Sequence, residues 1–323
     1  MNNIRVDNSA KITGKVRFGK EVYIGQGSII KSHDDSVRIG NTSWVLENSV
    51  VIGTGENPVK IGSKTVFGHR TVTIGAEIGN LCEIGNNTIF LPGSVVGDMC
   101  IFGEGTIIKE NMLIPSRSVV VGRPGRIIRT LDEDDENMIK RMRSNNILIE
   151  EYIENILEYK GGKINMSNLY EHNGKFPLVD SSAYVDNLAE ITGDVVIGPN
   201  SYIGSGVRII GNSHGPVKIG ANVTILENTV LHLLPDNKLI INDNVTIGPN
   251  CTIHGTIISK NTIVEAGSIV CDYSKIGENS LIKAGTLIKQ RDEFKENSII
   301  EGFPGKLIGE NSQEMKIPDW AGR

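Results

Sequence analysis

A hydrophobic residue recurs every six positions along much of this chain. A period of six fits neither the 3.6 residues per turn of a helix nor the simple alternation of an isolated hairpin. Six residues do make one short strand and one corner, and three such faces close a triangular coil. The repeat therefore predicts an all-β fold of parallel β-helices with the recurring residues stacked inside. They are Ile78, Ile84, Phe90, Val96, Phe102 and Ile108 in the first half, and Ile258, Val264, Val270, Ile276, Ile282 and Ile288 in the second.

A small side chain stands two positions before most of these ladder residues, where the coil turns a corner. Cys82, Cys100 and Cys251 occupy this position. A large side chain would clash there, and a free cysteine behaves as a small buried hydrophobe. We therefore expect these cysteines to be structural. Because none of the four cysteines forms a CxxC pair, the chain predicts neither a disulfide framework nor a zinc knuckle.

The chain is a tandem duplication. Both ladders end alike, with "VVVGRPGRIIR" at 119–129 and "SIIEGFPGKLIGE" at 298–310. We expect a first β-helix domain over residues 1–130, an α-helix and linker over 131–178, and a second β-helix domain over 179–323.

The segment between the two ladders has helical features. Its acidic first turn, after Thr130, suits the positive end of a helix dipole, and Gly161 and Gly162 would stop the helix. An apolar stripe at helical spacing would pack against a coil. The stripe consists of Ile139, Met142, Ile149, Ile153 and Ile156.

Composition narrows the class of protein. The 323 residues are 39% hydrophobic and 22% charged, as in an ordinary soluble protein. No apolar run approaches the ~20 residues that span a bilayer, and the start "MNNIRVDNSAKITG" does not resemble an export signal, so we expect a cytoplasmic protein without a membrane partner. The net charge of −5, without a Lys/Arg cluster, also argues against nucleic acid.

Two histidines of the second half are predicted to stack. His232 and His254 each follow an inward ladder residue, Leu231 or Ile253, so both should point outward from one face. They are 22 positions apart, which is one coil of three hexads plus four residues in a bulge at "LLPDN". Neighbouring strands lie about 4.8 Å apart, so both imidazoles can reach one metal ion. A catalytic zinc site usually needs three protein ligands, however.

The third ligand is expected from the other half. His69 lies two residues past a ladder position, at a corner from which it can reach a neighbouring coil. In the duplication, Pro249 stands at the position that corresponds to His69. Ile52 and Ile74 stand at the positions that correspond to His232 and His254. One half has kept the pair and the other the single histidine, so a complete site requires both. His33, His172 and His214 show no such pattern.

Three segments resemble the γ-class carbonic anhydrase-like branch of the hexapeptide-repeat, left-handed β-helix superfamily. "VFGHRTVTIG" at 66–75 and "TIGPNCTIHG" at 246–255 are similar to its "VGHxxxxHG" segment, and "ILENTVLH" at 225–232 is similar to its "IQDGSVLH" segment. The ladder also shortens to five residues after Thr73 and after Ile253, as in that branch. The resemblance implies two left-handed parallel β-helix domains joined by the helix.

The resemblance also implies a metal site between two β-helices. Its ligands would be His232 and His254 from one helix and His69 from a neighbour, with Zn, Fe or Co as the metal. Hydroxide available near neutral pH would attack carbon dioxide and yield bicarbonate, a lyase reaction. Glu227 matches the family aspartate and is the candidate catalytic carboxylate, either orienting a ligand or remaining a solvated structural residue.

Other family residues are missing. Leu46 and Leu226 replace the glutamine, and the arginine and aspartate of its "RGD" segment fall on Lys31 and His33 in the first half. In the second half they fall on Gly211 and Ser213. These departures argue against rapid hydration but leave the three ligands intact.

Two alternative functions stay open. An acyltransferase would bind acyl-CoA in a cleft between coils and use a histidine, such as His69 or His254, as general base. A non-catalytic assembly module would keep only the coils. For each of these functions we expect a homo-oligomer, because outward apolar residues such as Ile52 and Ile74 suit a contact between copies that excludes water.

Overall fold

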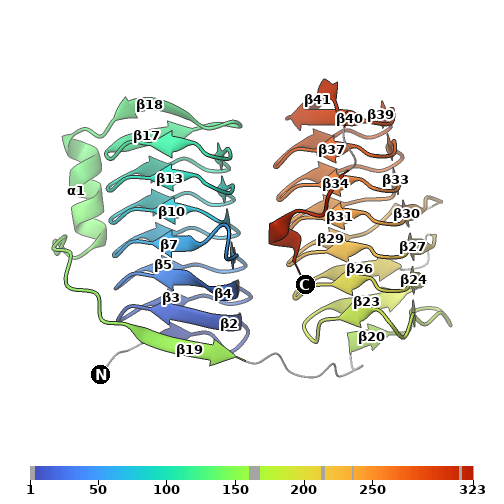
Figure 1. The fold of residues 1–323 in the computed structure, drawn as a ribbon, viewed down its shortest axis with the longest axis horizontal. Coiled ribbons are helices and arrows are strands. Elements are labelled where there is room, and N and C mark those ends of the chain that lie inside the picture. The colour runs from blue at the N-terminus through green and yellow to red at the C-terminus, as the bar shows by residue number, and fades with distance from the viewer. Residues whose placement is uncertain (1–3, 160–167, 212–214, 235, 313–314, 323) are drawn as a thin grey trace. The chain divides into compact units, whose positions relative to one another are not determined.

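The computed structural model contains two compact units, residues 1–161 and 162–323, which we call the first and second domains. Each domain is a column of stacked coils in which successive turns pair through parallel strands, and an antiparallel strand closes the last turn (Figure 1). This is the β-helix that the six-residue period predicted. The structure describes residues 4–159, 168–211, 215–234, 236–312 and 315–322.

In the first domain, the residues that the structure describes form an 8-stranded and an 11-stranded sheet. The spatial order of the first is β1 (Arg5–Val6), β3 (Tyr23–Ile24), β5 (Trp44–Val45), β8 (Val66–Phe67), β11 (Glu83–Ile84), β14 (Ile101–Phe102), β17 (Ser118–Val121) and β18 (Arg126–Thr130). The path of the second is β15 (Ile107–Ile108), β12 (Ile89–Phe90), β9 (Val72–Ile74), β6 (Val50–Gly53), β4 (Ile29–Ile39), β7 (Val59–Ile61), β10 (Glu77–Ile78), β13 (Val95–Val96) and β16 (Leu113–Ile114), with β2 (Lys11–Phe18) and β19 (Asn155–Tyr159) beside β4.

The described residues of the second domain form three sheets. One consists of β20 (Leu169–Tyr170), β23 (Glu190–Gly193), β26 (Arg208–Gly211), β29 (Val230–Leu231), β32 (Thr252–Ile253), β35 (Ile269–Val270) and β38 (Leu287–Ile288). Another consists of β21 (Leu178–Val179), β24 (Val195–Ile197), β27 (Val217–Ile219), β30 (Leu239–Ile241), β33 (Ile257–Ile258), β36 (Lys275–Ile276) and β39 (Glu293–Phe294). The third consists of β22 (Tyr184–Val185), β25 (Tyr202–Ile203), β28 (Thr224–Ile225), β31 (Thr246–Ile247), β34 (Ile263–Val264), β37 (Leu281–Ile282), β40 (Ser298–Gly302) and β41 (Gly305–Glu310). A 3₁₀ helix, η2, covers Asp319–Ala321.

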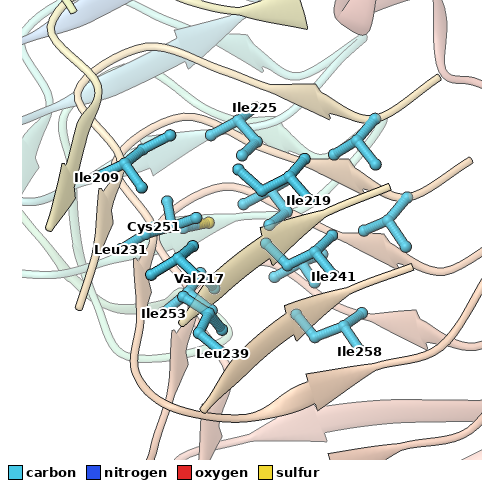
Figure 2. Close-up of a cluster of buried hydrophobic side chains, with 14 of the residues drawn as sticks. Ile209, Val217, Ile219, Ile225, Leu231, Leu239, Ile241, Cys251, Ile253 and Ile258 are labelled. Carbon is cyan, nitrogen blue, oxygen red and sulfur yellow. The ribbon is translucent and has the colours of Figure 1, made fainter. Parts of the chain in front are cut away.

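The ladder residues fill the interior of each column. In the second domain Ile253, Leu231 and Ile225 belong to one continuous buried cluster, to which all three faces contribute (Figure 2). The corner cysteines Cys82, Cys100 and Cys251 are buried as predicted. Burial raises the pKa of the Cys251 thiol to about 12, so it stays protonated and unreactive at neutral pH.

The start of the second domain lies inside the segment expected to be a linker. β20 pairs with β23 in parallel register, so the coils already include Leu169. The part of that segment at 163–167 lies outside the described residues. Among the residues that are described, no helix is both long and apolar enough to cross a bilayer.

The helix is shorter than predicted. α1 covers Glu133–Met142, whereas the sequence pattern predicted a helix up to the glycines at 161–162. Ser144 and Asn145 adopt left-handed backbone conformations that end it. Only Ile139 of the predicted apolar stripe is buried, against Leu81, Val119 and Leu131.

The residues after the helix run along the first domain and then join its sheet. β19 pairs with β2 in antiparallel register. Polar contacts hold the preceding stretch, including an ion pair from Arg143 to Glu83 at 2.5 Å and an ion pair from Lys20 to Glu150. The predicted helix was therefore wrong beyond Met142, because pairing with an open sheet edge replaced local helical structure.

Asp132 caps the N-terminus of α1. Replacing it by alanine should lower the free energy of unfolding of the first domain by about 1 kcal/mol. The Asp132 carboxylate accepts a hydrogen bond from the Asp135 N–H at 3.0 Å, and the Asp135 carboxylate accepts one from the Asp132 N–H at 3.0 Å. The measurement is urea unfolding followed by Trp44 fluorescence in a Trp320→Phe background. Asp134→Ala is the matched control, since Asp134 is exposed in the same turn; an equal loss in both variants would contradict the capping role.

Candidate metal-binding site

His232 and His254 lie on adjacent turns of the second domain, as their spacing predicted. β29 pairs with β32 so that Leu231 is opposite Ile253, and each histidine follows one of these buried residues. The backbone N–H of His232 donates to the Ile253 carbonyl at 3.0 Å. The two ring centroids are 5.8 Å apart at an interplanar angle of 77°. The pair thus presents two imidazoles on one face, and their binding of a metal stays a prediction.

Asp272 holds one of these rings. It lies 18 residues after His254, one turn further along the coil, and its Oδ2 is 3.0 Å from His254 Nδ1. The side chain of Asp272 is only 6% exposed, whereas that of His254 is 37% exposed. No sequence motif singled out this aspartate. The spacing of one coil between His254 and Asp272 was the available signal. The contact also depends on the directions of the two side chains, which the six-residue period does not determine.

Burial of Asp272 opposes its ionisation. Hydrogen bonds from the Leu234 backbone, from His254 and from Asn237 outweigh that effect, and the pKa of Asp272 is lowered. The carboxylate is therefore ionised at neutral pH and can only accept hydrogen bonds. The ring N–H at Nδ1 of His254 therefore donates to this carboxylate, and Nε2 is the ring nitrogen that remains available to a ligand.

His69 has a similar partner in the first domain. Its Nδ1 is 2.7 Å from Oε2 of Glu47, and its side chain is 53% exposed. The Tyr23 hydroxyl donates to Oε1 of the same glutamate at 3.3 Å, and the Asn86 side chain accepts the His69 backbone N–H at 2.7 Å. The corner therefore exposes a histidine whose ring is oriented by a carboxylate.

Glu227 is buried, with 1% of its surface exposed, rather than solvated. It lies on the corner that follows β28, and its backbone carbonyl accepts the N–H of Asn250 at 2.9 Å. Burial, followed by the charges of Glu227 and Asp186, raises the pKa of Tyr202. Glu227 thus places a carboxylate inside the structure beside a neutral phenol.

The other described histidines, His172 and His33, lie elsewhere in the fold. The His172 backbone forms a two-way bridge with Lys175, and His33 lies within β4. His214 lies outside the described residues, as does Ser213. Ile52 and Ile74, which match His232 and His254 in the duplication, face each other on β6 and β9. Both are buried, so the expectation that they provide an exposed apolar contact surface was wrong.

The second domain by itself supplies only two of the three predicted metal ligands. Over the described part of the chain, no three His, Cys, Asp or Glu side chains are close enough to bind one ion. Two imidazoles, one of them oriented by a carboxylate, have the donor chemistry of a zinc-type site, in which a ligating histidine usually donates its other N–H to a carboxylate or carbonyl. They fit such an ion once a third ligand is added.

Comparison with known proteins agrees with the fold. The family model "Hexapeptide repeat of succinyl-transferase" matches residues 58–90 and 238–271. A carbonic anhydrase of Geobacillus kaustophilus (strain HTA426) is 40% identical over 109 residues, which are 34% of this chain and 59% of the relative. Gamma carbonic anhydrase 1, mitochondrial, of Arabidopsis thaliana is 29% identical over 143 residues, which are 42% of this chain and 52% of the relative.

Among solved structures, a hexapeptide transferase family protein from Anaplasma phagocytophilum is 32% identical, with a TM-score of 0.44. The alignment covers 46% of this chain and 89% of that one. The chain spans just over half the length of the two carbonic anhydrases. From the six-residue coils, the family model and the two carbonic anhydrase relatives, the chain belongs to the hexapeptide-repeat, left-handed β-helix superfamily and is related to its γ-class carbonic anhydrase-like branch.

Proposed function

We propose that the protein is a γ-carbonic anhydrase-like metalloprotein with one metal site shared between unlike domains. His232 and His254 of a second domain and His69 of a first domain, from the same chain or from another copy, would hold the ion. The observation that carries the proposal is the pair of histidines on adjacent turns of the second domain, whose ring centroids are 5.8 Å apart, with Nδ1 rather than Nε2 of His254 directed at Asp272. Zinc fits three imidazoles best, and iron or cobalt would be accepted by the same donors.

The substrate would be carbon dioxide or bicarbonate. A zinc-type ion supplies the Lewis acidity that makes water a nucleophile near neutral pH. The protein's own part is to orient the ligands, through Asp272 and Glu47, and to provide the carboxylate of Glu227 as the candidate catalytic group that orients a ligand. Leu226 is fully buried where the family has a glutamine, so we expect slow hydration.

An acyltransferase is the second candidate, because the matching family model and one of the relatives are named for transferases. Such an enzyme needs a cleft with a general base. A hollow of about 510 Å³ opens at the first coil of the second domain, lined by apolar side chains that include Phe176, Leu178 and Val179. No histidine is among its described lining residues, so this hollow lacks the histidine general base that the acyltransferase hypothesis requires.

Elemental analysis of the purified protein tests the proposal. We expect about one zinc, iron or cobalt ion per chain, and carbon dioxide hydration that is measurable by stopped flow but slow. A metal content at the buffer background would contradict the shared site. Turnover of acetyl-CoA without metal would then identify an acyltransferase, and the absence of both activities would leave an assembly module.

A further inference from the structure

We propose that Asp272 is a positioning residue that keeps the proton of His254 on Nδ1 and so presents Nε2 to a metal ion. The expected effect on metal affinity rests on the proposed function. The physical core of the inference, the tautomer of one histidine, can be measured without any metal.

Four donors converge on the Asp272 carboxylate. Oδ1 accepts the backbone N–H groups of Leu234 and Gly255, each at 3.1 Å, and the side-chain amide of Asn237 at 3.1 Å. Oδ2 faces Nδ1 of His254 at 3.0 Å. The three contacts to Oδ1 immobilise the carboxylate, so the direction of Oδ2 is fixed and the imidazole must donate to it.

Leu234 and Asn237, which lie in the stretch predicted as a bulge, supply part of this arrangement. This stretch follows β29. Asn237 also donates to the carbonyl of Gly255, the residue after His254, at 2.7 Å. The four extra residues that lengthen this coil therefore link the bulge, the His254 corner and Asp272 of the next turn into one hydrogen-bonded unit.

The first half of the chain provides an internal comparison. Ile74 stands in the position of His254, and Pro92 stands in the position of Asp272. Asn57, the counterpart of the bulge asparagine, is retained there, and its N–H donates to Thr54 at 3.0 Å. A coil of this kind thus forms with a bulge asparagine but without the carboxylate. Within this chain the aspartate accompanies the histidine rather than the bulge.

Asp272→Asn is the decisive variant. If the amide oxygen keeps the three contacts of Oδ1, the NH₂ group faces Nδ1 of His254, which must then accept, and the proton moves to Nε2. Two-bond ¹⁵N–¹H spectra of histidine-labelled, metal-free protein should show a protonated Nδ1 in the wild type and a protonated Nε2 in the variant. Zinc affinity, measured by competition with a chelator, should fall about 10–100-fold.

Asp186→Asn is the matched control. Asp186 is a buried aspartate of the same domain that accepts the Tyr184 hydroxyl at 3.2 Å and the Leu188 N–H at 2.9 Å, with no histidine among these partners. Its replacement should change neither the His254 tautomer nor zinc affinity. Asn237→Ser is a milder second variant in case Asp272→Asn does not fold. It removes one donor to Asp272 and should weaken zinc binding less, about 2–10-fold.

The outcomes separate the inference from the proposed function. The positioning role is overturned if the His254 tautomer is unchanged in Asp272→Asn. If Asp272→Asn does not fold, an unchanged zinc affinity in Asn237→Ser overturns it. A changed tautomer in a protein that binds no zinc even as wild type supports the positioning role while the proposed function fails. Equal zinc affinity in the wild type and Asp272→Asn leaves the metal site standing and removes Asp272 from it.

Discussion

Replacing His69 by alanine should strip most of the bound metal from the intact protein, although the other two proposed ligands belong to the other domain. Two imidazoles hold a zinc-type ion far less tightly than three. If the ~10–16 kcal/mol of a four-ligand zinc site is divided evenly, each ligand contributes a few kcal/mol, so affinity should fall roughly 100-fold or more. The measurement is metal content after gel filtration, beside chelator competition for the affinity.

His172→Ala is the matched control for this variant. His172 lies in the second domain, its backbone bridges Lys175, and the proposal gives its side chain no role. Metal content should be unchanged in this control. If His69→Ala retains its metal as well, the shared site is wrong, even if His232 and His254 bind an ion by themselves.

A mixing experiment then locates the third ligand. His69→Ala and His254→Ala are unfolded together, refolded, and assayed for zinc. Recovery of binding above that of either variant alone means that the ligands come from two copies, since each variant supplies what the other lacks. No recovery means that all three belong to one chain.

Alanine at Phe90 should lower the free energy of unfolding of the first domain by about 3–5 kcal/mol, the usual cost of removing a buried phenylalanine. Phe90 is fully buried, with its ring centroid 6.2 Å from that of Phe67 and 5.1 Å from that of Phe102, both in edge-to-face geometry. Its counterpart in the second domain is Val270, so the duplication does not repeat this aromatic cluster of the first domain. Neighbouring turns cannot close the gap, because the strand ladders hold their spacing.

Urea unfolding followed by Trp44 fluorescence in the Trp320→Phe background measures this loss. Val95→Ala is the control, because Val95 lies on the next strand of the coil but is 40% exposed, and its truncation should cost no more than about 0.5 kcal/mol. A loss below about 1 kcal/mol for Phe90→Ala would mean that the interior of the coil is not closely packed around this ring.

The sequence predicted the coil correctly because the six-residue period corresponds directly to its geometry. Inward residues such as Leu231 and Ile253 pair as their spacing required, and the adjacent-turn placement of His232 and His254 follows from that pairing. The helix was overestimated for the opposite reason. The acidic turn and the apolar spacing are local signals, whereas Ser144 and the pairing of β19 with β2 ended the helix through backbone conformation and a distant strand.

The amino-acid sequence by itself determined the duplicated β-helix, the interior ladder and the placement of His232 and His254 on adjacent turns. A repeated short period leaves few ways to bury the same side chains. Only the tertiary structure decided that Asp272 and Glu47 orient His254 and His69, and that Glu227 is buried. Those contacts join residues 18 or more positions apart through side-chain directions at corners and in one bulge. Directions of this kind are determined by packing between successive turns, which the period of the sequence does not encode.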